Sequence, residues 1–115
     1  MTLRILSASV LLVFAGAAVA KGDPAAGAIK AKPCTACHGN DFNSEKDGQY
    51  PRLAGQYADY IARALHEYKE GGSTGRNNST MKGMAAPLSD QDIDDVAAYI
   101  SSLPGKLQDL SHMKK

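Results

Sequence analysis

Two cysteines and a histidine within five residues constrain this chain more than any other feature. Cys34 and Cys37 are the only cysteines in the sequence, and His38 follows the second one directly. On one turn of a helix, residues i and i+3 project from the same face. Two thiols in this arrangement can form thioethers to the two vinyl groups along one edge of a haem, with the following histidine beneath the iron as an axial ligand. The motif therefore predicts one covalently bound haem c, with Cys34, Cys37 and His38 as its binding residues.

A Cys-x-x-Cys pair has three other common uses. A disulfide is the main alternative in an oxidising compartment. A thioredoxin-like redox pair needs a βαβ context, and no strand-like alternation surrounds the motif, which Pro33 precedes. A structural zinc site needs four ligands, whereas the motif supplies at most three, and His66 and His112 are distant in sequence. The histidine that follows the second cysteine, together with an export signal upstream, favours haem attachment.

Residues 1–20 have the pattern of a secretory signal peptide. Arg4 supplies a positive n-region, an apolar stretch follows, and Ala18-Val19-Ala20 forms an A-x-A cleavage site. The apolar stretch is too short and too rich in alanine for a transmembrane span, which requires about 20 strongly apolar residues. An uncleaved membrane anchor is the alternative, although the cleavage site would then have no purpose. We expect cleavage after Ala20 and a periplasmic protein of residues 21–115.

The charge balance of the exported chain excludes two classes of partner. The sequence has 13 Lys and Arg residues against 12 Asp and Glu, and Arg4 is lost with the leader. The remaining polypeptide is formally neutral, which argues against nucleic acid as a partner and against a polybasic membrane patch. We therefore expect no stable membrane insertion once the leader is removed.

Hydrophobic spacing predicts an all-α protein with three main helices and long loops. A first helix is expected at 23–33, with Pro24 near its start. A second helix is expected at about 56–70, and a third follows the N-cap residue Ser89. The second helix has a continuous apolar stripe at helical spacing: Tyr57, Ile61, Ala64, Leu65 and Tyr68. Loops are expected at 39–55 and 71–88, and a polar tail from about 106.

The first helix contains a glycine, Gly27, in its first turns. Glycine costs up to about 1 kcal/mol relative to alanine inside a helix, so it often marks close contact with another element. A glycine that is merely tolerated near a frayed helix end is the alternative. The residues alone do not separate the two interpretations.

A sixth ligand for the iron would have to come from the loop 71–88. Met1 leaves with the leader, and Met113 lies in the polar tail, so Met81 and Met84 remain. Either could reach the haem, with Gly83 permitting a tight turn between them. Either could also be a flexible filler of the haem pocket. On the residues alone, both assignments stay open.

Taken together, these segments resemble a class I c-type cytochrome, and most closely one domain of the di-haem periplasmic cytochromes. The resemblance covers about residues 22–103, although this chain has one haem motif and the length of one domain. Beyond the haem motif, the resemblance depends on four further segments: Tyr50-Pro51-Arg52-Leu53-Ala54-Gly55-Gln56, Met81, Leu88-Ser89-Asp90-Gln91-Asp92 and Ala97-Ala98-Tyr99-Ile100.

The resemblance implies a set of roles for individual residues. In the family, the first and last helices cross at a glycine and an aromatic residue, which correspond here to Gly27 and Tyr99. The family's proline carbonyl accepts the proton on the free nitrogen of the axial histidine, and Pro51 stands at the matching position. The distal ligand stands seven residues before the leucine of Leu88-Ser89-Asp90, so the resemblance assigns Met81 as the ligand and Met84 to packing.

The function implied by the resemblance is one-electron transfer in the periplasm, between redox protein partners whose identity the sequence does not give. Haem iron with His and Met axial ligands has no open position for a substrate, so no enzyme activity is expected. The first alternative is an electron-accepting subunit bound to a dehydrogenase. The second is a haem enzyme or gas sensor in which the sixth ligand is labile.

Overall fold

The computed structural model describes residues 21–43, 49–72 and 76–106. These residues form helices α1 (Pro24–Lys30), α2 (Thr35–His38), α3 (Ala58–Glu70), α4 (Ser79–Ala85) and α5 (Asp90–Ser102), with a 3-10 turn η1 (Lys32–Cys34) before α2. The described ranges contain no strand, which confirms the all-α prediction. The predicted leader and the tail beyond residue 106 lie outside the described residues, as do 44–48 and 73–75 in the predicted loops.

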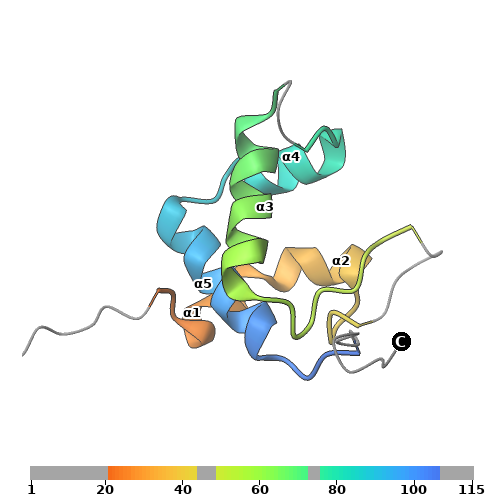
Figure 1. Cartoon of the computed structure of the whole chain (residues 1–115), viewed down its shortest axis with the longest axis vertical. Helices are drawn as coiled ribbons and strands as arrows, with labels where there is room; N and C mark the ends of the chain where they lie inside the picture. The colour runs from red at the N-terminus through yellow and green to blue at the C-terminus, as the bar shows by residue number, and fades with distance from the viewer. Residues whose placement is uncertain (1–20, 44–48, 73–75, 107–115) are drawn as a thin grey trace, which may run out of the picture.

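Helices α1 and α5 cross in close contact. Figure 1 shows this crossing near one end of α3, with α4 beside the other end. A β-carbon on Gly27 would lie 2.0 Å from the carbonyl oxygen of Asp95 and 2.8 Å from the β-carbon of Tyr99. Gly27 is therefore required by the close approach of the two backbones, and the crossing at Gly27 and Tyr99 is confirmed.

The first helix ends earlier than its sequence predicted. It begins after Asp23, whose side chain accepts the Ala25 N–H at 2.9 Å, and it ends at Lys30 rather than at residue 33. Pro33 has no N–H to donate, and its ring would clash with the carbonyl four residues earlier, so an α-helix cannot continue through it. The backbone tightens instead into η1, which leads directly to the haem motif.

Helix α3 begins at Ala58, and its apolar stripe is shorter than predicted. Ile61 and Leu65 are buried, but Tyr57 precedes the helix and is 76% exposed. Because Tyr57 has extended backbone, helical spacing does not place it with the other stripe residues. The prediction that Tyr57 belongs to the buried stripe was wrong.

Helix α5 confirms the predicted third helix. The Ser89 side chain accepts the Asp92 N–H, and the Asp92 side chain accepts the Ser89 N–H, which is a capping box. Its buried face, which packs against α1 and α3, consists of Ile93, Val96, Ala97 and Ile100.

The segment 71–88, predicted as a loop, contains α4. Asn78 caps this helix, since its side chain accepts the Met81 N–H at 3.0 Å. Among the residues of α4, only Ala85 is fully buried, and Gly83 has open space around it. A seven-residue helix is marginal by itself. It forms here because it packs against α3, a contact between distant segments that the local sequence does not reveal.

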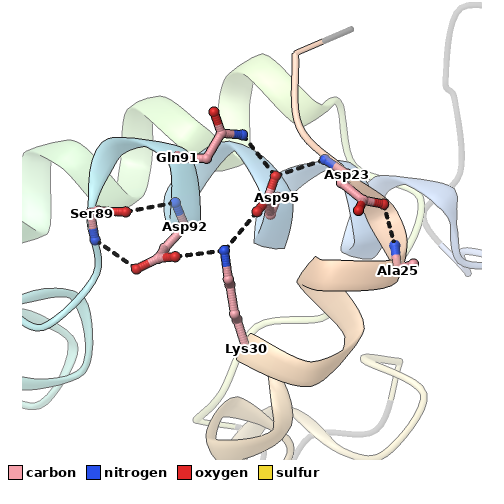
Figure 2. A network of polar contacts seen from close by, with 7 residues as sticks. All are labelled: Asp23, Ala25, Lys30, Ser89, Gln91, Asp92 and Asp95. Atoms are coloured by element: carbon pink, nitrogen blue, oxygen red, sulfur yellow. Dashed lines mark hydrogen bonds and ion pairs between the residues drawn. The ribbon is translucent and has the colours of Figure 1, made fainter.

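An ion-pair network fastens α1 to α5 beside the crossing (Figure 2). Lys30 Nζ lies 2.6 Å from Asp92 Oδ1 and 2.7 Å from Asp95 Oδ2, while Asp95 Oδ1 accepts the Asp23 N–H and the Gln91 amide. Asp95 is only 3% exposed. Lys30 first, and then the Asp23 and Gln91 donors, lower the pKa of Asp95 to about 2. A buried carboxylate with this many donors stays charged.

Four of the ten buried apolar residues in the core of the described residues are alanines, and one is aromatic. Its buried apolar members are Ala31, Phe42, Ala54, Ile61, Leu65, Ala85, Ile93, Val96, Ala97 and Ile100. Phe42, Ile93 and Val96 are the largest of the fully buried side chains. None of the described helices is long and apolar enough to cross a membrane.

Candidate haem site

The Cys-x-x-Cys-His motif begins at the last residue of η1 and continues through the four-residue helix α2. Cys34 ends η1 and precedes α2, and Thr35 Oγ1 donates to the Lys32 carbonyl at 2.7 Å. Gly39 ends α2, with its N–H bonded to the Thr35 carbonyl at 3.0 Å. Cys34 is thus presented from the end of η1, and Cys37 and His38 are presented from the turn of α2 that follows directly.

The thiols of Cys34 and Cys37 are not bonded to each other. The structure therefore does not contain the disulfide that was the main alternative to haem attachment. Both cysteines are half-buried, and Cys34 packs against the hydrophobic core. Burial raises the pKa of the Cys34 thiol, because partial removal from water disfavours the thiolate. Two free thiols three residues apart are available for covalent bonds to a third group.

His38 is buried and its ring is fixed by a carbonyl group. The side chain is 5% exposed, and Nδ1 lies 2.9 Å from the Pro51 carbonyl oxygen. A carbonyl oxygen only accepts hydrogen bonds, so Nδ1 carries the proton and Nε2 keeps its lone pair. Such a bond orients an imidazole and raises its basicity as a metal ligand. The structure therefore brings Pro51 to His38, as the resemblance implied.

Two aromatic side chains flank the His38 ring. Phe42 stacks on it with 6.5 Å between ring centroids, and Tyr50 approaches edge-on at 6.3 Å. Phe42 also contacts Tyr99 edge-on at 6.1 Å, which links the His38 ring to the α1–α5 crossing. Its carbonyl accepts the N–H groups of Leu53 and Ala54, close after Pro51 in the chain.

Sequence reasoning missed the role of Phe42. Its backbone is left-handed, with φ at 57°, which is unusual for a residue other than glycine, and its side chain is completely buried. The available signal was composition: Phe42 is the only phenylalanine after the predicted leader, and polar loop residues surround it. A large apolar side chain in such a loop indicates an anchor to the core.

The two methionines of α4 differ in their surroundings. Met81 is half-buried and packs against the same hydrophobic core as Cys34. Met84 is 37% exposed and is not among the side chains packed on that core. The tight turn that the sequence suggested around Gly83 does not occur, because Gly83 lies within α4.

These residues fit a covalently bound haem by the chemistry of their donors. Two free thiols match two vinyl groups, an imidazole with a free Nε2 is a proximal iron ligand, and a thioether sulfur is the distal ligand of many c-type haems. The hydrogen bond at Nδ1 leaves His38 in the tautomer that such a ligand requires. An all-helical fold with this donor set defines the class of c-type haem proteins.

Comparisons with known proteins agree with this class. The cytochrome c family profile matches residues 24–104. Cytochrome c4 from Stutzerimonas stutzeri is 41% identical over 109 residues, which cover 90% of this chain and 51% of the relative. Cytochrome c-554(548) from Halomonas halodenitrificans is 45% identical over 86 residues, covering 70% of this chain and 96% of the relative. The chain therefore belongs to the cytochrome c family.

A solved structure supports the fold assignment. The crystal structure of reduced recombinant cytochrome c4 from Pseudomonas stutzeri matches with a TM-score of 0.68 at 41% identity, covering 75% of this chain and 48% of that chain. The architecture is thus the class I cytochrome c fold, with haem c as covalent cofactor and iron as its metal, and haem-based electron transport is the function that the family supports. The chain spans about half the length of the cytochrome c4 relatives from Stutzerimonas stutzeri and Pseudomonas aeruginosa.

One further relative is named as the electron acceptor of an enzyme. A protein from Thiomonas intermedia named as a thiosulfate dehydrogenase electron acceptor is 40% identical over 79 residues. The aligned part covers 69% of this chain but 35% of that relative.

Proposed function

We propose that this chain is a periplasmic one-electron carrier that holds one haem c through thioethers to Cys34 and Cys37. In this proposal His38 is the proximal axial ligand of the iron and Met81 is the distal ligand. Pro51 supports the proximal ligand through its carbonyl oxygen. The chemistry that the cofactor supplies when bound is exchange of one electron between the ferric and ferrous states.

The hydrogen bond between His38 Nδ1 and the Pro51 carbonyl is the observation that carries the proposal. It fixes a buried imidazole, with its lone pair on Nε2, one residue after the second of two free thiols. A surface histidine of no function would not need a carbonyl partner or two flanking aromatic rings. This arrangement is the one that a proximal ligand needs, because orientation and basicity are both set before the metal is bound.

The protein's contribution to electron transfer is to keep the iron coordination the same in both oxidation states. Cys34 and Cys37 retain the cofactor covalently, and His38 is held by groups from two other segments. A methionine thioether as distal ligand favours the ferrous state and raises the reduction potential. With both axial positions filled by the chain, no position is left for a substrate, which is why we propose a carrier rather than an enzyme.

Met81 is preferred to Met84 on the basis of its packing. Met81 is half-buried against the core that Cys34 also contacts, whereas Met84 projects to the surface. A distal ligand has to lie on the side of α4 that faces the cofactor, and the packing of Met81 against the core supports its choice for that position. The preference from packing agrees with the spacing before Leu88-Ser89-Asp90.

Export to the periplasm is part of the proposal and is supported by the pattern of residues 1–20. The n-region, the apolar stretch and the Ala18-Val19-Ala20 site predict cleavage after Ala20. Covalent haem in the exported protein would then serve redox protein partners, without nucleic acid and without stable insertion into the membrane.

A second candidate function is favoured by one specific relative. The likeness to a thiosulfate dehydrogenase electron acceptor supports a role as the electron-accepting subunit of a dehydrogenase. The same haem would then serve one permanent partner. The two functions differ in one measurable property, since a free carrier elutes as a single small protein from a native periplasmic extract, whereas a subunit elutes with its dehydrogenase.

Intact-mass analysis of protein exported to a bacterial periplasm tests the haem assignment. The expected mass is that of residues 21–115 plus one haem, and both cysteines should be inert to thiol reagents. The reduced protein should give the pyridine haemochrome spectrum of a haem with both vinyl groups saturated.

Two results would contradict the proposal in separate ways. Release of haem into acidified acetone would show that the haem is not attached covalently. Rapid binding of carbon monoxide by the reduced protein at neutral pH would show an open iron position and would favour an enzyme or sensor over a carrier.

A further inference from the structure

Helix α4, which carries Met81, depends on contacts outside itself for its position. It has seven residues, and only Ala85 is fully buried. An isolated helix of this length does not persist in water. Its placement therefore comes from the segments on either side and from how they attach to α3.

Both ends of the α4 segment are attached to α3. On the C-terminal side, Lys69 Nζ of α3 donates to the Leu88 carbonyl, two residues before α5. On the N-terminal side, Arg76 reaches Tyr60 of α3 and, about two helical turns further along, the consecutive residues Glu67 and Tyr68. The two attachments enclose the whole of α4 between them.

The Arg76 contacts form a single cluster on the α3 surface. Nε donates to Glu67 Oε2 at 3.1 Å, and Nη2 donates to the Tyr60 hydroxyl at 3.0 Å. The guanidinium carbon also lies 5.4 Å from the centroid of the Tyr60 ring and 5.6 Å from that of Tyr68. We call these four residues, Tyr60, Glu67, Tyr68 and Arg76, the arginine clasp.

The clasp exceeds an ordinary surface ion pair. An exposed pair of charges contributes little by itself, because water screens it and two long side chains must be ordered. Here one planar guanidinium donates in two directions and lies against two aromatic rings, which adds cation–π attraction to the hydrogen bonds. A lysine has the charge but not the fork, so it could not make both hydrogen bonds in this geometry.

A short path connects the clasp to Met81. Arg76 stands two residues before Asn78, and the Asn78 side chain accepts the N–H of Met81 itself at 3.0 Å. Arg76 and Met81 are thus five residues apart, with the cap of α4 between them. Displacement of Arg76 from α3 would release the segment that leads into Asn78, and the first turn of α4 would then lose its fixed position against α3.

We infer that Arg76 is a positioning residue for Met81, because it fixes the segment before α4 to α3 and so keeps the methionine available as the distal ligand. This inference rests on the proposed His38–Met81 ligation. The methionine sulfur competes with any added ligand for the same iron position. Loosening α4 therefore strengthens the apparent binding of the competitor without any change at His38.

Imidazole binding to the ferric haem protein measures this competition. In Arg76→Ala the apparent affinity for imidazole should rise about tenfold, the size expected when charge-assisted hydrogen bonds are lost. Arg76→Lys should lie between Arg76→Ala and the wild type. Arg63→Ala is the matched control, because Arg63 is an exposed arginine of α3 with no side-chain hydrogen bond or ion pair to the described residues. The imidazole affinity of Arg63→Ala should match that of the wild type.

A second variant and a second readout keep the test independent of folding defects. Tyr60→Phe removes only the hydroxyl acceptor and should raise imidazole affinity by a smaller factor, about threefold. Amide hydrogen exchange should accelerate for residues 79–85 in Arg76→Ala and stay unchanged in α5. If Arg76→Ala does not fold, the Tyr60→Phe result decides the question.

The outcomes separate this inference from the function on which it rests. Imidazole affinities within twofold of the wild type in both Arg76→Ala and Tyr60→Phe would overturn the positioning role of Arg76. The assignment of Met81 as ligand would stand, provided that Met81→Ala loses the sulfur-to-iron absorption. A wild-type ferric protein without that absorption would overturn both the clasp and the Met81 assignment.

Discussion

The two proposed iron ligands are held in very different ways. His38 is buried, bonded to a carbonyl and flanked by rings that connect to the crossing of α1 and α5. Met81 is half-buried on a seven-residue helix that is attached by a side-chain cap and by surface contacts to α3. The proximal side is thus part of the core, and the distal side is an attachment to it. Helix α4 should therefore unfold before the surroundings of His38 when the protein is heated or treated with denaturant.

The largest expected effect comes from removing the covalent attachment at the proximal side. Cys34→Ser/Cys37→Ser should abolish cooperative thermal unfolding, because the described core has only ten buried apolar residues, four of them alanines, and needs the haem to complete it. Circular dichroism across a temperature ramp gives the result. A sharp, cooperative transition in this variant would show that the polypeptide core is sufficient without haem.

The same substitution at two glycines contrasts the two sides directly. Gly27→Ala places a β-carbon against the Asp95 carbonyl and should lower the free energy of unfolding by about 3 kcal/mol, at the upper end for an overpacked core. Gly83→Ala in α4 meets open space and should raise it by up to about 1 kcal/mol, the difference in helix propensity. Guanidinium titrations measure both values. Equal changes in the free energy of unfolding for the two variants would contradict the difference between the α1–α5 crossing and α4.

Acid should weaken the α1–α5 crossing over a defined pH window. The pKa of Asp95 is lowered to about 2 by Lys30 and by the Asp23 and Gln91 donors, against about 3.9 for an unfolded aspartate. The unfolded chain therefore binds more protons between these values, and the contribution of Asp95 to stability falls as pH falls. The difference in unfolding free energy between wild type and Asp95→Asn should be constant above about pH 5 and shrink toward pH 2. A difference that stays constant down to pH 2 would contradict the network.

The smallest effect is expected at the cap of α4. Asn78→Ala removes the acceptor for the Met81 N–H and should cost about 1 kcal/mol, confined to α4. Amide exchange of residues 81–85 should rise about fivefold, while that of α5 stays the same. Asn78→Ser keeps a capping oxygen and is the matched control. Faster exchange in both helices would mean that α4 does not open independently.

Local sequence predicted the elements that are stable through local interactions. The cap at Ser89 and the apolar spacing of the last helix gave α5 correctly, and the haem motif was found because its residues are contiguous. Helix α4 was missed because the segment that contains it is held against α3 by contacts that the local sequence does not show: Lys69 donates to the Leu88 carbonyl, and Arg76 donates to Glu67. Gly83, within the helix, favoured a loop for the same segment.

Of the residues that contact His38, one could be assigned from the sequence and another could not. Pro51 could be assigned to His38 through the family resemblance, and the hydrogen bond between them is present. Phe42 could not be assigned, because its contact with His38 depends on a left-handed backbone and on Tyr99, 57 residues further along the chain. Burial of Met81 and exposure of Met84 likewise follow from packing and not from spacing in the sequence.

The near-infrared spectrum of the ferric protein tests the proposed ligation most directly. A weak band from sulfur-to-iron ligation should be present in the wild type, abolished in Met81→Ala and retained in Met84→Ala. Met81→Ala should also have a lower reduction potential and bind small ligands at the iron, since the thioether that favours ferrous iron is gone. Loss of the band in Met84→Ala with retention in Met81→Ala would contradict the assignment of Met81.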